Sequence, residues 1–456
     1  MTLTLLPRRI SRLALLFSLA LLLAPFAHAA AESAAFSPQV RLGYRIGDQW
    51  EPAIAADGYG HVYVLYPQYG RVPPWLTDPL PSMTLLVSDN DGSTWQLPRE
   101  ITPHLTAQFD PQIVVDPADH RTVYAAWLQN RNTDVMVAKS VDFGQSWAVV
   151  IADRDDEDAD KPVLAVRGQD VYVGFNRDGG MRVAASHDGG LTFTVSNVAP
   201  QLNLIRALGS GATIDPKGGV HLAWAGYTQG INVGRSAHLS LTSYSALASY
   251  GEGSVGPGRV NLYTSRSADG GKTWKTTQMT ASRAAPDCWA FRCEAGFLGA
   301  QITIASDAAG TLYALWNAGT QNGTPERIFF ASSTTAGETW SEAADVSLAP
   351  PGAEHAFPAL VAADPGDVRI AWMDTRRASL WNTFYRSSTN GGATWSAESK
   401  LSSYVPGYRY IHAKGYSFPF GDYFEMAIDD QGRTQAVWGE GLNYHSPGSI
   451  WYSSGR

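Results

Sequence analysis

The octapeptide Ser267-Ala-Asp-Gly-Gly-Lys-Thr-Trp274 recurs, with small changes, at five other places in the chain. The other copies are residues 88–95, 140–147, 186–193, 333–340 and 388–395. Each copy has the chemistry of a tight turn, because its Ser hydroxyl and third-position Asp accept bonds from backbone N–H groups and its Gly takes a positive φ. Asn90, Asn390 and Thr335 replace the Asp in three copies. Recurrence of this kind indicates a repeat architecture.

A second repeat lies upstream of each octapeptide and has the pattern strand, turn, strand, ending in an aromatic residue. It occurs seven times, at residues 52–66, 111–127, 162–175, 212–224, 302–316, 358–372 and 423–438. Seven copies against six octapeptides are explained if the last four-stranded unit ends at a third strand, 450–454, and takes its fourth strand from the start of the chain. Residues 39–46 alternate apolar and polar side chains, as a half-buried strand does. We therefore predict an all-β, seven-bladed β-propeller whose N-terminal strand closes the last blade.

Spacing and composition support this architecture. Ser88 and Ser388 are 300 residues apart over five intervals, which gives 60 residues per repeat. The 456-residue chain is 44% hydrophobic and 17% charged, with 44 Gly, 15 Trp and 20 Tyr, a composition that favours short strands joined by tight turns. The net charge of −8 argues against nucleic acid as a partner, because an acidic surface repels phosphate backbones.

The first 29 residues have the layout of a secretory signal peptide. Arg8, Arg9 and Arg12 precede an apolar run at 13–23, and small residues follow at 27–30. The run is shorter than the roughly 20 residues of a spanning helix, so we expect no membrane span in the mature chain, with a retained anchor as the alternative. We predict a secreted or periplasmic protein whose single propeller domain comprises residues 30–456, by either the general or the twin-arginine export route.

The octapeptide resembles the Asp-box, or bacterial neuraminidase repeat, of sialidases and related β-propellers. The resemblance covers nearly all of the mature chain. It implies that the boxes are structural and lie on the face away from the site. Sialidases of this superfamily have six blades, which is the alternative to the seven predicted here, although seven-bladed Asp-box propellers with quite different activities also exist.

The opposite rim is predicted to carry the long loops, among them 226–260 and 402–422, and long loops are often functional. Aromatic side chains there suit the faces of sugar rings, or pack the loops against each other. The candidates for glycan contact are Trp75, Trp381, Tyr410 and Tyr416. Cys288 and Cys293 lie in another rim loop, and in an oxidising compartment we expect a disulfide between them rather than a metal site.

Carboxylates are predicted at the same rim. Alignment of the inner strands on their leading proline places Glu51, Asp110 and Lys161 at one position of three successive blades, with Glu425 two residues deeper at the same parity. Such an arc supplies a general acid and base, binds Ca²⁺ through its oxygens, or pairs with Lys161 and loop N–H groups. Glu51, Asp110 and Glu425 are the candidate catalytic residues. We predict no dedicated metal site and no cofactor, with Ca²⁺ as the exception left open.

The catalytic set of a sialidase is not recognisable. The resemblance would imply an arginine triad that clamps a carboxylate, with its first member in an Arg-Ile-Pro motif, but the chain has Trp50-Glu51-Pro52 there. Arg376 and Arg377 remain candidates for anion binding. We therefore expect a glycan-directed propeller, as a sialidase-like glycoside hydrolase using rim carboxylates or as a non-catalytic propeller that binds a protein or envelope component. Oligomeric state and substrate stay open, since fold does not carry function by itself.

Overall fold

The computed structural model describes Met1 and residues 33–44, 48–49, 51–69, 81–102, 106–204, 206–227, 259–283, 300–319, 325–377, 380–402, 424–439 and 449–456. The chain divides into two units, Met1–Ala31 and Glu32–Arg456, and every element below belongs to the second. The described residues form strands and turns without helices, so no helix among them has the length and apolarity to cross a membrane.

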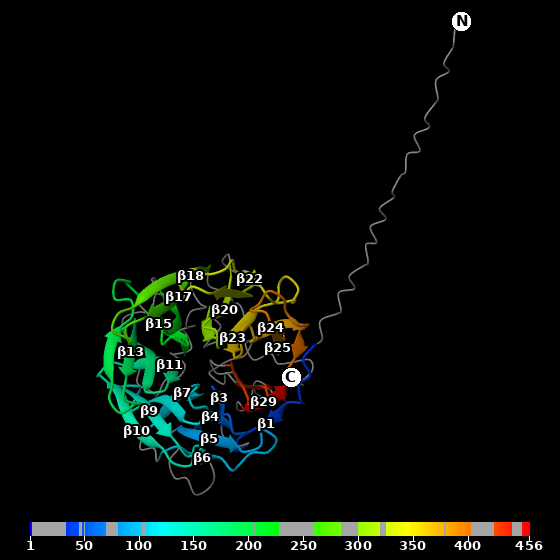
Figure 1. Cartoon of the computed structure of the whole chain (residues 1–456). Helices are drawn as coiled ribbons and strands as arrows, with labels where there is room; N and C mark the ends of the chain where they lie inside the picture. The colour runs from blue at the N-terminus through cyan, green and yellow to red at the C-terminus, as the bar shows by residue number, and fades with distance from the viewer. Residues whose placement is uncertain are drawn as a thin grey trace. The chain divides into compact units, whose positions relative to one another are not determined.

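Seven antiparallel sheets form a ring within this unit (Figure 1). The first strands of consecutive blades contact one another all the way around, from the first blade to the seventh and back to the first. The seven-bladed propeller predicted from the sequence is therefore confirmed, and the six-bladed alternative is wrong. The strands of each blade, from inner to outer, are β3 (Ala53–Ala56), β4 (Val62–Tyr69), β5 (Ser82–Ser88), β6 (Arg99–Glu100); β7 (Gln108–Val115), β8 (Val123–Gln129), β9 (Asp134–Ser140), β10 (Ala148–Arg154); β11 (Ala159–Arg167), β12 (Asp170–Arg177), β13 (Gly180–Ser186), β14 (Thr194–Asn197); β15 (Arg206–Ile214), β16 (Val220–Tyr227), β17 (Arg259–Ser267), β18 (Lys275–Arg283); β19 (Ile302–Ser306), β20 (Leu312–Ala318), β21 (Arg327–Ser333), β22 (Ala344–Asp345); β23 (His355–Ala362), β24 (Val368–Arg377), β25 (Leu380–Ser388), β26 (Ser399–Lys400); and β27 (Phe424–Ile428), β28 (Thr434–Gly439), β29 (Ile450–Gly455), β1 (Val40–Arg41).

The ring closes through its N-terminal segment, as predicted, although the strand is Val40–Arg41 and the predicted strand at 39–46 gives way to a turn at Gly43 and Tyr44. Strand β1 is the outermost strand of the seventh blade and pairs antiparallel with β29, with Val40 opposite Tyr452. The backbone N–H of Leu42 continues the ladder with a bond to the Ile450 carbonyl, at 2.9 Å. Short strand β2 (Asp48–Gln49) already belongs to the first blade, where it pairs with β4. The crossing from the last blade to the first therefore falls between Leu42 and Asp48.

The octapeptides form the turns between the third and fourth strands of six blades. In the copy at 186–193, Ser186 Oγ accepts the N–H of Gly190 at 2.9 Å. Asp188 Oδ1 accepts the N–H of Thr192 at 2.9 Å, and Oδ2 accepts its hydroxyl at 2.6 Å. The hydroxyl and amide bonds that Thr192 and Ser186 donate to Asp188 lower the pKa of this carboxyl. The turn is thus a set of side-chain bonds to its own backbone, as the residue types predicted.

The aromatic residue that ends each octapeptide packs against the preceding blade. Trp395 contacts Phe330 of β21 with ring centroids 4.9 Å apart, and Trp95 contacts Tyr452 of β29 at 5.1 Å, both edge-to-face. The seventh blade has no octapeptide. Phe36 of the N-terminal segment takes that place, edge-to-face on Tyr385 of β25 at 4.8 Å. The closing segment therefore supplies both the missing strand and the missing aromatic anchor.

Candidate central site

The inner strands of four blades share an irregular backbone at their N-terminal ends. Glu51, Asp110, Lys161 and Phe357 each precede a proline and have φ between 48° and 55°, in the left-handed region. The pairing of β7, β11 and β23 shifts register immediately after them, which is the mark of a β-bulge. Non-glycine residues with positive φ are strained and are often found at functional sites. The sequence alignment on the leading proline had identified this position in three of the four blades.

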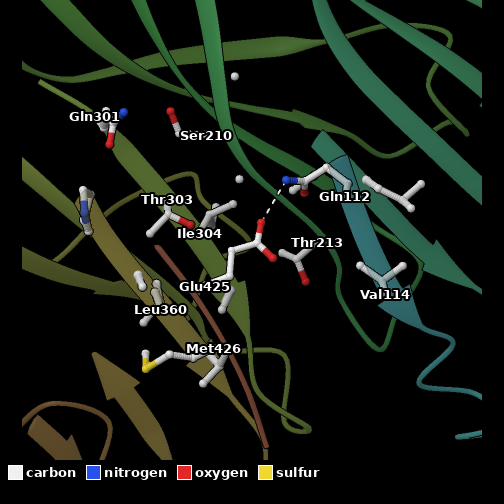
Figure 2. Close-up of a pocket in the computed structure, with 18 of the residues that line it drawn as sticks. Gln112, Val114, Ser210, Thr213, Gln301, Thr303, Ile304, Leu360, Glu425 and Met426 are labelled. Atoms are coloured by element: carbon white, nitrogen blue, oxygen red, sulfur yellow. Dashed lines mark hydrogen bonds between the residues drawn. The ribbon is translucent and has the colours of Figure 1, made fainter. Parts of the chain in front are cut away.

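A cavity of about 380 Å³ lies among the inner strands, and residues from all seven blades line it (Figure 2). One register position recurs around it: Gln112, Gly211, Thr303, Ala359 and Glu425 each pair with the same position of their own second strand. Gly211 and Ala359 keep this belt open because they are small. A Cβ on Gly211 would lie 2.7 Å from Thr303 Oγ1, so the glycine also permits β15 to approach β19.

Glu425 is the acid of this belt. Its Oε1 accepts a hydrogen bond from Gln112 Nε2 at 2.9 Å (Figure 2). Its Oε2 accepts the backbone N–H of Ile54 at 3.1 Å. The side chain keeps some surface on the cavity but is otherwise enclosed by protein. Burial raises the pKa of Glu425 to about 7, against the two donated hydrogen bonds, which lower it. At neutral pH this carboxyl is present in both its protonated and ionised forms.

The other two candidate acids lie next to each other but do not line the cavity. Asp110 and Glu51 are 7% and 4% exposed. Burial first, and the charge of Glu51 second, raise the pKa of Asp110 well above its ordinary range, while Lys161 opposes the rise. Lys161 does line the cavity, although it is only 5% exposed. Of the three candidate carboxylates, Glu425 alone is among the described residues that line the cavity, and Glu51 and Asp110 are buried.

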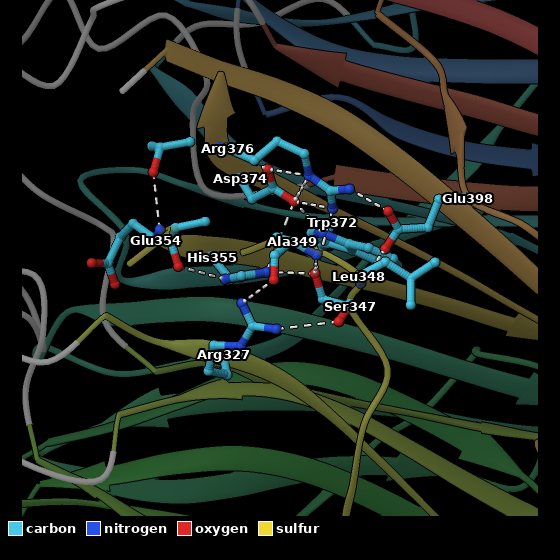
Figure 3. A network of polar contacts seen from close by, with 12 residues as sticks. Arg327, Ser347, Leu348, Ala349, Glu354, His355, Trp372, Asp374, Arg376 and Glu398 are labelled. Atoms are coloured by element: carbon cyan, nitrogen blue, oxygen red, sulfur yellow. Dashed lines mark hydrogen bonds and ion pairs between the residues drawn. The ribbon is translucent and has the colours of Figure 1, made fainter. Parts of the chain in front are cut away.

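The two predicted anion-binding arginines have different surroundings, and Figure 3 shows those of Arg376. Arg376 bonds Asp374 Oδ2 at 2.6 Å, contacts Glu398, and stacks over Phe384 at 3.8 Å, so its charge is already matched inside the sixth blade. Burial lowers the pKa of Arg376, but the bonds to Asp374 and Glu398 outweigh burial, and the net change is upward. Arg377, at the end of β24, is exposed. Of the pair, only Arg377 has a side chain open to an external anion.

Of the four aromatic candidates for glycan contact, the structure describes Trp381. Trp381 is 3% exposed and packs in the core between the sixth and seventh blades, with Met373 and Trp438 among its cluster. Its place in that core is what the packing alternative for the aromatic residues anticipated. Trp75, Tyr410 and Tyr416 lie outside the described residues, and so do Cys288 and Cys293. The glycan contacts and the disulfide predicted for them stay predictions.

Residues 153–160 include six acidic side chains, and Asp153 and Asp160 are among those that pair with arginines. Asp153 lies 3.1 Å from Arg177, which is fully buried, and Asp160 lies 2.5 Å from Arg206. Within the described part of the chain, no three His, Cys, Asp or Glu side chains are grouped so as to hold a metal ion.

Sequence reasoning missed the polar wall of the cavity and a second acidic cluster. Gln112, Ser210, Thr213, Gln301 and Thr303 line the cavity but belong to no motif (Figure 2). The sequence pattern could have identified Gln112, because it stands two residues after the aligned Asp110, as Glu425 stands two residues after position 423, where the seventh strand repeat begins. The second cluster contains Glu326 and Glu354, which no repeat position marks.

No protein-family model matches the chain, and no curated protein matches it. Among solved structures, a protein of unknown function from Dyadobacter fermentans DSM 18053 aligns with a TM-score of 0.52 at 15% identity, covering 93% of this chain and 99% of that chain. A PL25 ulvan lyase aligns with a TM-score of 0.47 at 13% identity, covering 91% and 95%. A Trypanosoma rangeli sialidase in complex with 2,3-difluorosialic acid gives 0.46 at 13%, covering 92% and 59%. At these identities the likeness is one of fold.

Proposed function

We propose that the protein acts on glycans, with a saccharide bound in the central cavity and Glu425 as its proton donor. The observation that carries the proposal is the placement of Glu425: a carboxyl with a pKa of about 7, turned toward a cavity and fixed by two donated hydrogen bonds. A carboxyl that remains partly protonated at neutral pH is what glycosidic cleavage requires of its general acid.

The cavity has the size and chemistry to hold a small sugar unit. Its volume of about 380 Å³ falls within the range of small-molecule sites. The hydroxyls of Ser210, Thr213 and Thr303 and the amide of Gln301 exchange hydrogen bonds with sugar hydroxyls in either direction, since each group contains both a donor and an acceptor. Apolar neighbours such as Ile304 and Leu360 complete the wall (Figure 2).

In the proposed step Glu425 transfers its proton to the glycosidic oxygen as the bond from the anomeric carbon to that oxygen breaks. A water molecule then adds to the anomeric carbon and gives up a proton to a second carboxylate. Glu51 is the candidate for that second role, because the raised pKa of Asp110 disfavours the ionised form that would accept the proton. Glu51 interacts with Asp110, which lies two residues along β7 from Gln112, the residue that bonds Glu425.

A specific observation also favours the second candidate function, a propeller that binds a glycan without cleaving it. Neither Glu51 nor Asp110 lines the cavity, and hydrolysis with two carboxylates requires both to reach the substrate. The polar wall and Lys161 would suffice for binding alone.

The test is a screen of the purified protein against chromogenic glycosides, including a sialoside, together with calorimetric binding of the corresponding free saccharides. The Glu425→Gln variant keeps a side chain of the same shape without the proton to donate, and Glu342→Gln changes an exposed glutamate just after an octapeptide. We expect turnover in the native protein and in Glu342→Gln, and its loss in Glu425→Gln. Binding without turnover would select the second function, and neither binding nor turnover would refute both.

We further propose that the chain is an exported Asp-box protein. The support is the signal-like N-terminus and the bonds from Ser and Asp to the backbone in the octapeptide turns. N-terminal sequencing of the protein recovered from outside the cytoplasm should begin near residue 30. An intact Met1 on the recovered protein would contradict export with cleavage.

A further inference from the structure

Arg167 places a positive charge at the end of the central cavity remote from Glu425. It is the last residue of β11 and lines the cavity together with Lys161, near the start of the same strand, so the cavity follows β11 along most of its length. In register, Arg167 lies four residues beyond Val163, which occupies in its blade the position that Glu425 has in the seventh. A strand advances about 3.3 Å per residue, so the two levels are roughly 13 Å apart along the strand.

The fold does not require an arginine at this position. Five other blades have an aspartate there, at Asp57, Asp116, Asp215, Asp307 and Asp429, and in each the Oδ1 atom accepts the backbone N–H two residues further on at 2.8–3.0 Å. These carboxylates hold the turns between first and second strands. The turn of the third blade is a hairpin with two residues between Arg167 and its partner Asp170, and needs no such carboxylate.

The guanidinium of Arg167 has no partner in the described part of the chain. Its Nε is buried without a hydrogen bond, and no described carboxylate forms an ion pair with it. Asp116 of the second blade approaches the same turn, but its two oxygens accept the backbone N–H of Gly168 at 3.0 and 2.9 Å. Charged groups removed from water are normally paired, so an external anion would supply what the protein leaves out.

The other groups of the cavity wall leave this charge uncompensated. Among the described residues that line the cavity, only Lys161, Arg167 and Glu425 are charged. The charge of Lys161 interacts with Asp110, behind the wall. Thr213 of the fourth blade lines the cavity two register positions beyond the level of Glu425, and therefore between that level and Arg167. Its hydroxyl is a further donor for an anion held at this end.

We propose that Arg167 makes this end of the cavity an oxyanion site, which takes a carboxylate or a sulfate group. The planar guanidinium binds either group through two parallel hydrogen bonds. The site adjoins the octapeptide face, since the Gln169 carbonyl of the same turn accepts the N–H of Gly189 in the octapeptide, at 2.9 Å. It therefore lies at the end of the channel opposite the rim where the sequence predicted the anion-binding arginines.

The position of the site specifies where the ligand carries its acid. Because Arg167 and Glu425 lie at different levels, the acidic group belongs to a part of the ligand away from the bond that Glu425 would cleave. This inference rests on the proposed function in taking the ligand to be a saccharide, which then is an acidic oligosaccharide. A free anion in the cavity is the other source of the same chemistry, and the oxyanion site itself does not need the reaction.

The test is calorimetric titration of the native protein, at neutral pH and constant ionic strength, with three probes. They are cellobiose, cellobiuronic acid, which differs from cellobiose by one carboxylate, and sodium sulfate. We expect the acidic disaccharide to bind at least about tenfold more tightly than the neutral one, and sulfate to compete with it. Arg167→Gln should abolish this preference. Lys217→Gln removes a positive charge from the exposed equivalent turn of the next blade, outside the cavity wall, and should keep the preference.

Arg167→Lys keeps the charge without the planar fork, so it should retain part of the preference, and it replaces Arg167→Gln should that variant fail to fold. Sulfate binding that depends on Arg167, without a preference between the disaccharides, assigns the site to a free anion. If neither disaccharide binds in that case, the saccharide proposal fails and the oxyanion site stands. An equal preference in native protein and Arg167→Gln, or no binding of sulfate and no preference in the native protein, would overturn the site, whereas turnover that depends on Glu425 would still support the proposed function.

Discussion

At the scale of single residues, the placement of Glu425 links its protonation to stability. Its pKa is about 7 in the folded chain against an ordinary 4.5, so the protonated form is favoured by folding. Its contribution to stability is complete below about pH 4.5 and is lost as the pH rises through 7. A difference of this size corresponds to roughly 3 kcal/mol. The bonds from Gln112 and Ile54 moderate this cost without removing it.

Glu425→Gln should therefore stabilise the protein at neutral pH. We expect the variant and the native protein to have similar melting temperatures near pH 4.5, and the variant to melt higher at pH 7.5, because glutamine cannot ionise. Thermal unfolding at the two pH values measures the effect. Equal melting temperatures at pH 7.5 would show that the carboxyl reaches solvent more freely than its enclosure indicates.

The turn glycines give a second test at this scale. Gly392 has a φ of 89°, and a Cβ there would collide with the ring of Phe330. Gly218 has a φ of 85° but nothing within 4 Å of the same position. Gly218→Ala should cost about 1 kcal/mol from backbone strain alone, and Gly392→Ala about 2–4 kcal/mol from strain and overpacking together. Equal losses in chemical denaturation would mean that Phe330 moves aside.

At the scale of elements, the N-terminal segment should contribute as much to the stability of the ring as a complete octapeptide does. Phe36 and Trp395 pack edge-to-face on equivalent third-strand residues, Tyr385 and Phe330. Phe36→Ala and Trp395→Ala should each destabilise the ring by about 2–4 kcal/mol, measured by denaturant titration. The control is Val40→Ala on β1, where the side chain is 46% exposed. Its loss should stay below about 1 kcal/mol.

Much of the arrangement of the strands could be predicted from the sequence, because it depends on the period of the sequence repeats. The count of inner strand pairs exceeded the count of octapeptides by one, and the closure by β1 follows from that difference. Glu425 was found in the same way, through strand parity. The positions of Glu51 and Asp110 relative to the cavity could not be predicted in this way, because the inner strands are irregular where these residues lie. Strand β7 has a bulge after Asp110, and the inner strand of the first blade is divided into β2 and β3 around Glu51.

The Glu326–Glu354 pair could not be predicted either. The two residues are 28 positions apart, belong to different blades, and meet only once the fifth and sixth blades pack. The equivalent positions of the neighbouring blades do not carry acids, so no repeated sequence position marks either residue. Contacts between blades depend on packing distances that the period of the sequence does not contain.

At the scale of the whole molecule, two groups of carboxyls oppose each other in their response to pH. Burial raises the pKa of Glu326, Glu354, Glu425 and Asp110, so their share of stability is present in acid and lost as the pH rises toward and beyond 7. The octapeptide acids behave oppositely. Hydrogen bonds from Ser146 and Thr273 lower the pKa of Asp142 and of Asp269 to about 2, so their share is present above the ordinary value and lost as the pH falls toward 2.

The melting temperature should therefore pass through a maximum at about pH 4.5–5.5. Differential scanning calorimetry between pH 2 and pH 8.5 measures this directly. The double variant Glu354→Gln, Glu425→Gln should flatten the alkaline side and leave the acid side unchanged. A melting temperature that rises steadily from pH 5 to pH 8 would contradict the assignment of the raised pKa values.

The closure described for the seventh blade gives the ring a preferred place to come apart. Six blades are built from consecutive strands of one stretch of chain, whereas the seventh is held to its outer strand by the short β1 ladder and by Phe36. Unfolding should start at this seam, so that the rate of opening is governed by a segment of about ten residues rather than by the average strength of the blades. A peptide with the sequence of residues 33–42, added in excess, would compete for the vacated edge of β29 and trap the opened ring. The rate at which the peptide binds would then measure the rate at which the native segment separates.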